Sequence, residues 1–280
     1  MAALVLTLGL LPPTRAAAQN PPPGDNRTVV PRDTAHPARH QTLFTYRDAI
    51  LAAGFVGLTV AMFPIDENVA RQIRQDSTFN GFAQRSAVGF ETISSPGAYV
   101  IGGSLYLVGR IAKKPDLTDF AWHGTEAVLV ANGVTGFLKG TLGRSRPFVS
   151  NDTNPRDFRF GGGFRTSDRQ SFPSGHTSTA FAAAAAVTSE IRRLHPRALP
   201  YVATVMYGGA TLVGLSRMYH NKHWASDVAL GAAVGTFSGL KVVRYSHAHP
   251  DNKVDRVILH AVIAPDGHGG GYLGLALPGP

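Results

Sequence analysis

The chain has 280 residues, of which 44% are hydrophobic and 16% are charged, compared with about 25% charged in ordinary globular domains. Its formal net charge of +9 fits an anionic substrate, an anionic membrane surface or nucleic acid, but no recognised nucleic-acid-binding module is present. Because the chain has no cysteine, disulfides and thiolate metal sites are excluded.

The first two segments of the chain precede the predicted fold. Residues 1–18 contain an apolar run, two prolines and three consecutive alanines, a pattern typical of a signal peptide or, if it is not cleaved, of an N-terminal anchor. Residues 19–44 are rich in proline and polar side chains, which predicts a disordered linker.

From residue 45 onward, apolar runs alternate with polar segments. The runs cover residues 49–63, 97–112, 122–138, 178–188, 201–215 and 228–240. Residues 67–93 are amphipathic and predict one or two surface helices. We therefore predict an all-α fold, a bundle of about six core helices over residues 45–245. Residues 246–280 form a short non-helical C-terminal tail, in which two apolar stretches separated by glycines favour a β-hairpin.

The bundle is predicted to be embedded in a membrane. Each apolar run is shorter than the roughly 20 residues of a span, but its flanks restore the length. Basic clusters at 110–114, 192–197 and 241–244 would share one side of a six-span bundle, with the polar loop 139–174 on the other side. A cleaved signal peptide followed by six spans would reverse that orientation. The alternatives are therefore an uncleaved N-terminal segment, an apolar run that does not span, or a soluble periplasmic domain.

Three clusters carry side chains suited to phosphoryl transfer. In the first, Lys139 offers a compact positive charge, and Arg146 offers a planar fork that binds two phosphate oxygens. Pro147 ends the helix there, and Arg144 is an additional cation nearby. A basic helix end that complements the macrodipole is the structural alternative.

The second cluster is Pro173-Ser174-Gly175-His176, which leads from the polar loop into an alanine-rich helix. Ser174 is a candidate N-cap, and Gly175 allows a ligand to approach the backbone. The free N–H groups of the helix start favour an anion, to which His176 would donate a proton. An ordinary capped helix with a surface histidine is the structural alternative.

The third cluster begins with Ser216 and Arg217 and continues with His223 and Asp227. The spacing of four residues places His223 and Asp227 on one face of a helix, where a carboxylate can orient an imidazole as nucleophile or base. Arg217 adds another fork for phosphate. A surface ion pair is the structural alternative, and it is disfavoured by the position of Asp227 at the start of an apolar helix.

Together the clusters read Lys-x6-Arg-Pro, Pro-Ser-Gly-His and Ser-Arg-x5-His-x3-Asp, in this order. This triple resembles the signature of the type 2 phosphatidic acid phosphatase and vanadium-dependent haloperoxidase superfamily, and all 11 fixed positions match. The resemblance covers about residues 45–245. Each motif alone is weak, whereas the ordered triple is highly specific.

The resemblance implies a role for each matching residue. His223 would attack phosphorus and form a phosphohistidine, Asp227 would orient His223, and His176 would protonate the leaving oxygen and then activate water. The phosphate oxygens would be bound by three cations, Lys139, Arg146 and Arg217, with help from the backbone at Ser174 and Gly175. Such a site implies no metal and no cofactor, although vanadate would bind as a phosphate mimic.

Several other residues receive structural interpretations. His220 is interpreted as a pocket or surface residue, and His247 and His249 as solvent-exposed histidines without a metal. Trp122 and His123 are expected to begin a helix, as an interfacial anchor or as core. Asp119 and Glu126 are interpreted as members of structural pairs. Between residues 139 and 176, seven basic and three acidic residues predict a field that attracts anions.

The predicted function is a phosphoric monoester hydrolase that acts on lipid phosphates such as phosphatidate, phosphatidylglycerol phosphate or undecaprenyl diphosphate. The alternatives are a soluble periplasmic acid phosphatase, a vanadate-dependent haloperoxidase, and a non-enzymatic membrane bundle. The predicted location is the bacterial cell envelope, in the inner membrane with the site facing the periplasm, or the periplasm itself. The partner is an anionic, phosphorylated substrate, and no nucleic acid is expected.

Overall fold

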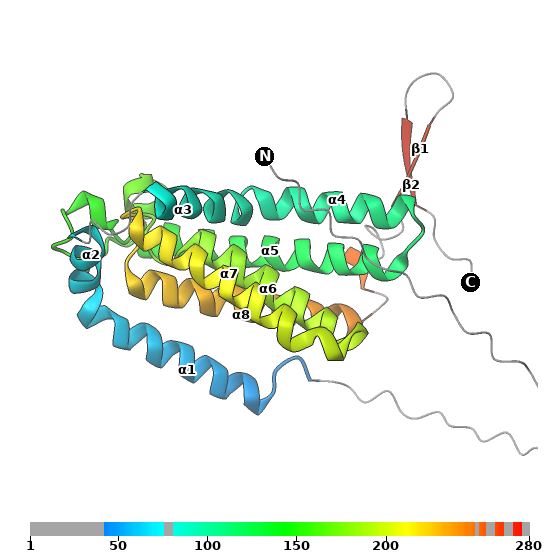
Figure 1. Ribbon diagram of the computed structural model, residues 1–280, viewed down its shortest axis with the longest axis horizontal. Coiled ribbons are helices and arrows are strands. Elements are labelled where there is room, and N and C mark those ends of the chain that lie inside the picture. Colours follow the sequence, from blue (N-terminus) through cyan, green and yellow to red (C-terminus); the bar gives the residue numbers. More distant parts are fainter. Residues whose placement is uncertain (1–41, 76–80, 250–251, 256–260, 266–270, 276–280) are drawn as a thin grey trace, which may run out of the picture. The chain divides into compact units, whose positions relative to one another are not determined.

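The computed structural model describes residues 42–75, 81–249, 252–255, 261–265 and 271–275, and within them it has eight α-helices (Figure 1). These are α1 (Tyr46–Met62), α2 (Asp66–Gln75), α3 (Gly81–Ser94), α4 (Gly97–Ile111), α5 (Pro115–Leu142), α6 (Gly175–Leu194), α7 (Leu199–Tyr219) and α8 (Ala225–Ala248). The predicted all-α bundle is confirmed. The predicted segments 1–18 and 19–44 lie outside the described residues, apart from residues 42–44.

The helices extend beyond the apolar runs that predicted them. Helix α5 begins at Pro115, because a proline in the first helical position needs no hydrogen-bond acceptor for its nitrogen. The prediction that Trp122 and His123 begin a helix was therefore wrong, since both lie well inside α5. His123 is also buried, which favours the core alternative for this residue.

The centre of the bundle is the close packing of α6 against α8, two helices that lie side by side in Figure 1. Three glycines spaced four residues apart make this contact possible. A Cβ atom at Gly231, Gly235 or Gly239 would lie 2.6, 2.2 or 2.5 Å from a backbone oxygen of α6 or its N-cap. Alanines on α6 are fully buried opposite this stripe, so small residues on both helices set the distance between them.

The polar loop between α5 and α6 is held in place by interactions with its own residues and with the end of α5. Gly143 ends α5 with φ of 59°, and a Cβ there would lie 1.9 Å from Arg159 O, so the prediction that Pro147 ends this helix was wrong. Arg169 forms an ion pair of 2.9 Å with Asp157, whose carboxylate also accepts a hydrogen bond from Ser145. This loop therefore has a defined structure that can position side chains at the end of the bundle.

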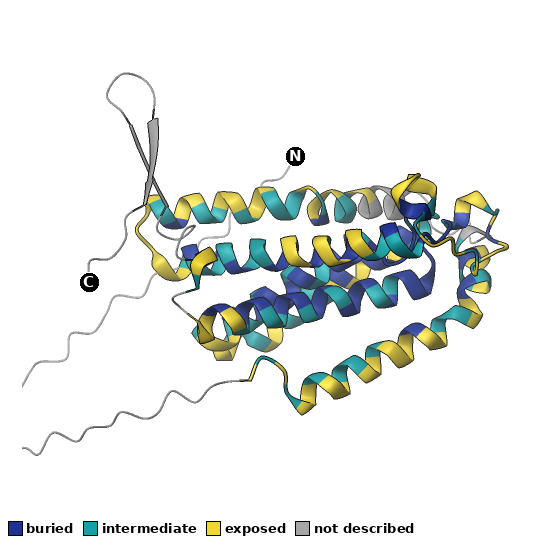
Figure 2. Ribbon diagram, turned by 180° about the vertical axis from the view of Figure 1, so that it is seen from behind, coloured by how far each residue is buried: buried dark blue, intermediate teal, exposed yellow. Residues whose placement is uncertain are grey.

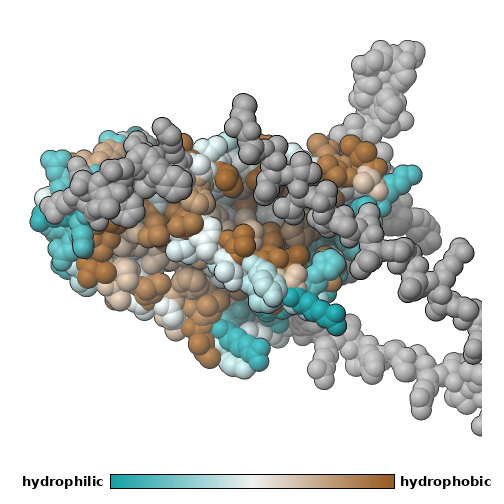
Figure 3. Space-filling view, in the orientation of Figure 1, coloured by the Kyte–Doolittle hydropathy of each residue, from teal (hydrophilic) through white to brown (hydrophobic). Residues whose placement is uncertain are grey.

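The outer faces of several helices carry exposed apolar side chains. On α1 these include Ile50, Val56 and Val60, and similar residues occur on α4, α5 and α7. Figure 2 shows the contrast between the exposed α1 and the buried residues of α6 and α8, and Figure 3 shows apolar patches on the surface. Apolar surface of this extent favours contact with lipid.

Among the described residues, three helical segments are long and apolar enough to cross a membrane: Tyr46–Ile73, Pro196–Tyr219 and Ala225–Ala248. This is fewer than the six spans considered from the sequence. Helix α4 has only 15 residues, and α5 and α6 bury polar side chains that serve the site and the bundle interior. By length and composition, these three segments are the candidate membrane spans, and the first of them is the most exposed.

The C-terminal tail contains two short strands, β1 (Ala261–Pro265) and β2 (Gly271–Leu275). They pair in an antiparallel manner, with Ile263 opposite Leu273. The prediction of a non-helical tail from residue 246 was wrong in part, because α8 continues to Ala248 and residues 253–255 are helical. The tail does include a two-stranded hairpin, at slightly different residues from the two stretches selected by apolar pattern.

Candidate active site

Four helix ends meet at one end of the bundle and bring the three sequence clusters together. The C-terminal ends of α5 and α7 carry Lys139 and Arg217, and the N-terminal ends of α6 and α8 carry His176 and Asp227. Gly175 lies between these elements, since a Cβ there would be 3.6 Å from Lys139 Cε. All eight candidate residues therefore belong to one region, although the motifs are far apart in sequence.

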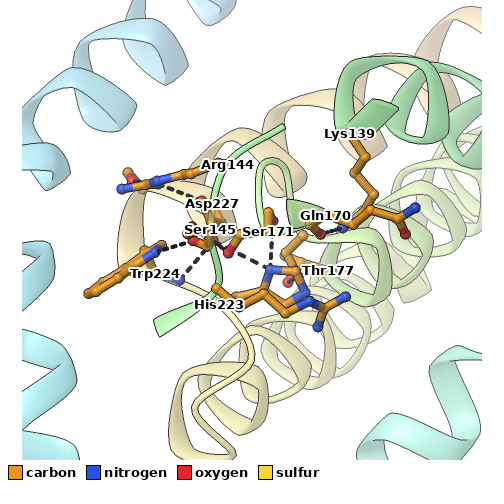
Figure 4. Close-up of polar contacts among 12 residues, drawn as sticks. Lys139, Arg144, Ser145, Gln170, Ser171, Thr177, His223, Trp224 and Asp227 are labelled. Atoms are coloured by element: carbon orange, nitrogen blue, oxygen red, sulfur yellow. Dashed lines mark hydrogen bonds and ion pairs between the residues drawn. The ribbon is translucent and has the colours of Figure 1, made fainter. Parts of the chain in front are cut away.

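His223 is buried in the turn before α8 and its ring is oriented by a backbone carbonyl. Its Nδ1 lies 2.7 Å from Ser171 O and 3.4 Å from Asp227 Oδ2 (Figure 4). A carbonyl oxygen can only accept, so Nδ1 carries the proton and Nε2 keeps a free lone pair. Burial and the nearby Lys139 ammonium lower the pKa of His223 to about 3, which keeps the imidazole neutral.

Asp227 has more partners than the sequence suggested. Its carboxylate accepts hydrogen bonds from Ser171 Oγ and from the backbone nitrogen of Trp224, at 2.8 Å for the latter, and it pairs with Arg144 (Figure 4). The contact with Trp224 caps the N-terminus of α8. Asp227 therefore anchors the turn that contains His223, and its carboxylate is the second of two groups near His223 Nδ1.

Arg144, interpreted from the sequence as an extra cation of the phosphate site, has a different role. It is fully buried, and its guanidinium pairs with Asp227 and, at 2.7 Å, with Asp66 of α2. The rings of four aromatic residues surround it at 4.9–5.5 Å: Phe63, Phe158, Phe172 and Trp224. The two carboxylates neutralise its charge, so Arg144 supports the site from behind.

Three other cations remain close to the two histidines. Lys139 Nζ donates to Gln170 O, and Arg146 Nε donates to Ser167 O at 3.0 Å, so loop carbonyls orient both side chains. Burial, and next the positive charge of Arg146, lower the pKa of Lys139 to about 7. Arg217 is also mostly buried, and its Nε has no hydrogen-bond partner among the described residues. Concentrated positive charge of this kind favours an anionic ligand.

The second motif offers fewer free backbone N–H groups to an anion than the sequence suggested. Ser174 is the N-cap residue of α6, but its N–H donates to Asp227 O at 2.9 Å and its hydroxyl accepts from Thr177. The prediction that the Ser174 backbone assists an anion is therefore wrong, because that N–H is already used. Gly175 is the first residue of α6, where N–H groups lack intrahelical acceptors, so it remains the backbone candidate.

His176 lies in the first turn of α6, near the cations. Burial, and then the positive charge of Arg217, lower the pKa of His176 to about 4 in the absence of a ligand. A bound phosphate dianion would favour the protonated imidazole, since an opposite charge stabilises the charged form. His176 is thus suited to become an acid only when an anion is present.

Glu91 of α3 is a member of the site that sequence reasoning missed. Its carboxylate pairs with Arg217 Nη1 at 2.6 Å and with His220 Nδ1 at 2.6 Å. The sequence offered no motif around Glu91, because its partners are more than 120 residues away. Asp66 was missed because its partners, Arg144 and Ser226, are also far away in sequence. Its full burial is known only from the structure.

Comparisons with known proteins relate this part of the chain to one family. Residues 120–251 match the family model described as the PAP2 superfamily, a range that contains all three motifs. Among curated proteins, a lipid A 1-phosphatase of Porphyromonas gingivalis is 45% identical over 69 residues, which is 25% of this chain. The match spans only 15% of that relative's length.

The comparison with solved structures gives two matches. A transmembrane PAP2-type phosphatidylglycerolphosphate phosphatase from Bacillus subtilis superposes with a TM-score of 0.51 at 18% identity, covering 75% of this chain and 99% of that chain. LpxE of Aquifex aeolicus gives a TM-score of 0.47 at 23% identity, covering 65% of this chain and 96% of that chain. The Bacillus structure shows that the bundle described above is a known architecture.

Proposed function

We propose that this protein is a metal-independent phosphatase that hydrolyses phosphate monoesters of lipids through a phosphohistidine on His223, and the match of residues 120–251 to the PAP2-superfamily model supports this. The observation that carries the proposal is the state of His223. Its Nδ1 proton is directed to Ser171 O, and its free Nε2 belongs to an imidazole kept neutral by burial and by the nearby charges of Lys139 and Arg146.

The reaction proceeds in two balanced steps. In the first, His223 Nε2 forms a bond to phosphorus while the ester P–O bond breaks, and His176 gives a proton to the leaving oxygen. In the second, His176 takes a proton from water, whose oxygen attacks phosphorus and breaks the P–N bond. Lys139, Arg146 and Arg217 stabilise the charge on the phosphoryl oxygens in both steps.

A lipid substrate is supported by an apolar groove next to the site. The groove has a volume of about 460 Å³ and is lined by residues of α3, α4, α5, α6 and α7. It includes Ala180, four residues after His176, and Val213, four residues before Arg217. One end of the groove therefore lies one helical turn from the catalytic side chains, where an acyl chain attached to a bound phosphate would extend.

The mechanism is tested by phosphate release at 25 °C with EDTA in the assay. We expect His223→Ala to abolish release, and His220→Ala to retain it, because His220 is not one of the fixed positions of the third motif and its ring contacts Glu91. Vanadate is expected to inhibit the wild type as a phosphate mimic. Full activity of His223→Ala would refute the phosphohistidine, and a requirement for added metal would refute metal independence.

The choice of substrate is tested by filling the groove. Gly209 lines it, neighbouring Gly208 does not, and a Cβ at either position meets no atom within 4 Å. We expect Gly209→Leu to lower kcat/KM for phosphatidate while leaving p-nitrophenyl phosphate hydrolysis unchanged, and Gly208→Leu to change neither. If Gly209→Leu changes the hydrolysis of neither substrate, the acyl chain does not bind in this groove. If the wild type prefers p-nitrophenyl phosphate to phosphatidate, the result favours the periplasmic acid phosphatase.

We also propose that the protein lies in the inner membrane of a bacterial envelope with its site facing the periplasm. The absence of cysteine permits a direct test by single-cysteine labelling in intact cells. Arg165 is exposed in the loop beside the site, and Arg192 is exposed near the opposite end of α6. An impermeant maleimide should label Arg165→Cys and spare Arg192→Cys. The reverse pattern would place the site in the cytoplasm, and labelling of both would indicate a soluble periplasmic protein.

A further inference from the structure

A second cluster of ionisable side chains lies at the end of the bundle away from the catalytic residues. His123 of α5, Glu190 of α6 and His247 of α8 place one donor atom each within 4.8 Å of one another. Glu190 Oε1 is 2.8 Å from His123 Nδ1 and 2.7 Å from His247 Nε2. Because 16 residues of α5 separate His123 from Lys139, the two sites are about 24 Å apart.

The cluster is supported by a carboxylate from the segment after α8. Asp255 Oδ2 lies 3.7 Å from His123 Nε2, on the opposite side of the ring from Glu190. Trp122 Nε1 donates to Asp255 at 2.8 Å and Asn252 Nδ2 donates to it at 2.6 Å. Histidines that bind metal commonly donate their other N–H group to a carboxylate, and Asp255 would take this role if the His123 ring moved closer than the present 3.7 Å.

Acidic groups outnumber basic groups around this cluster. Asp119 and Glu126 lie on α5 four residues before and three residues after His123, on the same face of the helix. Glu126 Oε2 is buried and has no hydrogen-bond partner within the described residues. Arg193 contributes one positive charge, 3.3 Å from Glu190. Four carboxylates thus gather in a chain whose net charge is +9, and an additional cation would balance them.

We propose that His123 Nδ1, Glu190 and His247 Nε2 bind a divalent zinc ion. Two imidazoles and one carboxylate form a donor set that zinc prefers, with a fourth position for water. Zinc–ligand bonds of about 2.0–2.2 Å place two tetrahedral ligand atoms about 3.3 Å apart. The two histidine nitrogens now lie 2.8 and 2.7 Å from Glu190 Oε1, so each imidazole has to move away from Glu190 by roughly half an ångström. The ion joins α5, α6 and α8, and through Asp255 it also fixes the segment that follows α8.

This inference is independent of the phosphatase proposal. The ion lies too far from His223 to act on a substrate, and it serves to hold helix ends together. It also extends the interpretation of His247, which is solvent-exposed, as the sequence suggested, but contacts Glu190. In contrast, His249 stacks on Tyr245 and has no contact with Glu190, so it provides a matched control.

The test measures zinc in the full-length protein, purified without a polyhistidine tag and incubated with Zn²⁺ before desalting. We expect roughly one bound zinc per chain in the wild type and in His249→Ala, and a loss of bound zinc in His247→Ala. Added Zn²⁺ should raise the unfolding temperature of the first two proteins and leave that of His247→Ala unchanged. Prolonged chelation should lower it in the wild type.

A second variant covers the case in which His247→Ala does not fold. Glu190→Gln keeps the shape of the side chain and removes the charge, so it should also lose zinc. Equal zinc content in the wild type and in a folded variant would overturn the proposal and identify the cluster as histidines that share protons with Glu190. Phosphate release by the zinc-depleted protein at 25 °C separates this outcome from a failure of the phosphatase mechanism.

Discussion

The buried Arg144 is the side chain whose replacement we expect to be most informative. Its guanidinium donates five hydrogen bonds, to Pro155 O twice, to Ser226 Oγ and to the carboxylates of Asp66 and Asp227. Lysine presents three donors from a single point, so Arg144→Lys cannot bridge two carboxylates through a planar fork. At least one fully buried carboxylate then loses its partner.

The size of the effect follows from this loss. Removing one partner of a buried ion pair costs about 3–5 kcal/mol. A domain of this size loses about 2–4 °C in unfolding temperature per kcal/mol, so we expect a decrease of roughly 6–20 °C. Because Trp224 lies 5.5 Å from the guanidinium, its fluorescence is a direct reporter of unfolding in detergent. A slower turnover should accompany the loss, since Asp227 supports the turn of His223.

Arg169→Lys is the matched control for this experiment. Arg169 lies in the same loop and pairs with one carboxylate, that of Asp157, but both side chains are partly exposed. Exposed pairs contribute about 0.2–1 kcal/mol, so the control should unfold within a few degrees of the wild type. If Arg144→Lys unfolds within about 2 °C of the wild type and turns over at the same rate, the assignment of Arg144 as the support of Asp227 is refuted.

Two further predictions concern the anion site and the helix packing. Lys139 has a pKa of about 7 without ligand, so its charge is lost as pH rises through that value. Sulfate keeps the same charge across this pH range, so its competitive inhibition should weaken above pH 7 in the wild type. In Lys139→Arg the inhibition should weaken only at higher pH, because the guanidinium stays protonated. An identical pH profile would contradict the assignment. Gly235→Ala should destabilise the protein, because its Cβ would lie 2.2 Å from Ser178 O, whereas Gly208→Ala meets open space. Equal unfolding temperatures would show that α6 and α8 can separate without cost.

The membrane assignment depends on which surfaces the fold leaves exposed. Composition and run length suggested six spans, whereas three helical segments of the described chain meet the requirements of length and hydropathy. Helices α5 and α6 contribute His176, Lys139 and other polar side chains to the interior. Polar side chains lower the hydropathy of a helix whether they face lipid or protein, so run length alone could not separate the two cases.

Much of the fold and of the candidate site could be predicted from local features. Apolar runs ended by proline or glycine predicted the core helices, because helix formation depends on neighbouring residues. The order and spacing of the three motifs selected His223, His176, Lys139 and Arg217 before any coordinates, since these positions require particular side chains. Helix boundaries were less accurate, as α5 shows, because its first turns are polar.

The sequence by itself determined which helices form and which side chains are suited to bind and transfer phosphate. Only the tertiary structure decided how the arginines of the first motif are used. Arg144 and Arg146 are two residues apart, yet one is neutralised by Asp66 and Asp227 while the other remains beside the histidines. The tertiary structure also decided the partner of His247, whose Nε2 contacts Glu190, 57 residues away in sequence. A charge is neutralised by the groups that folding brings within a few ångströms of it, and sequence distance carries no information about them.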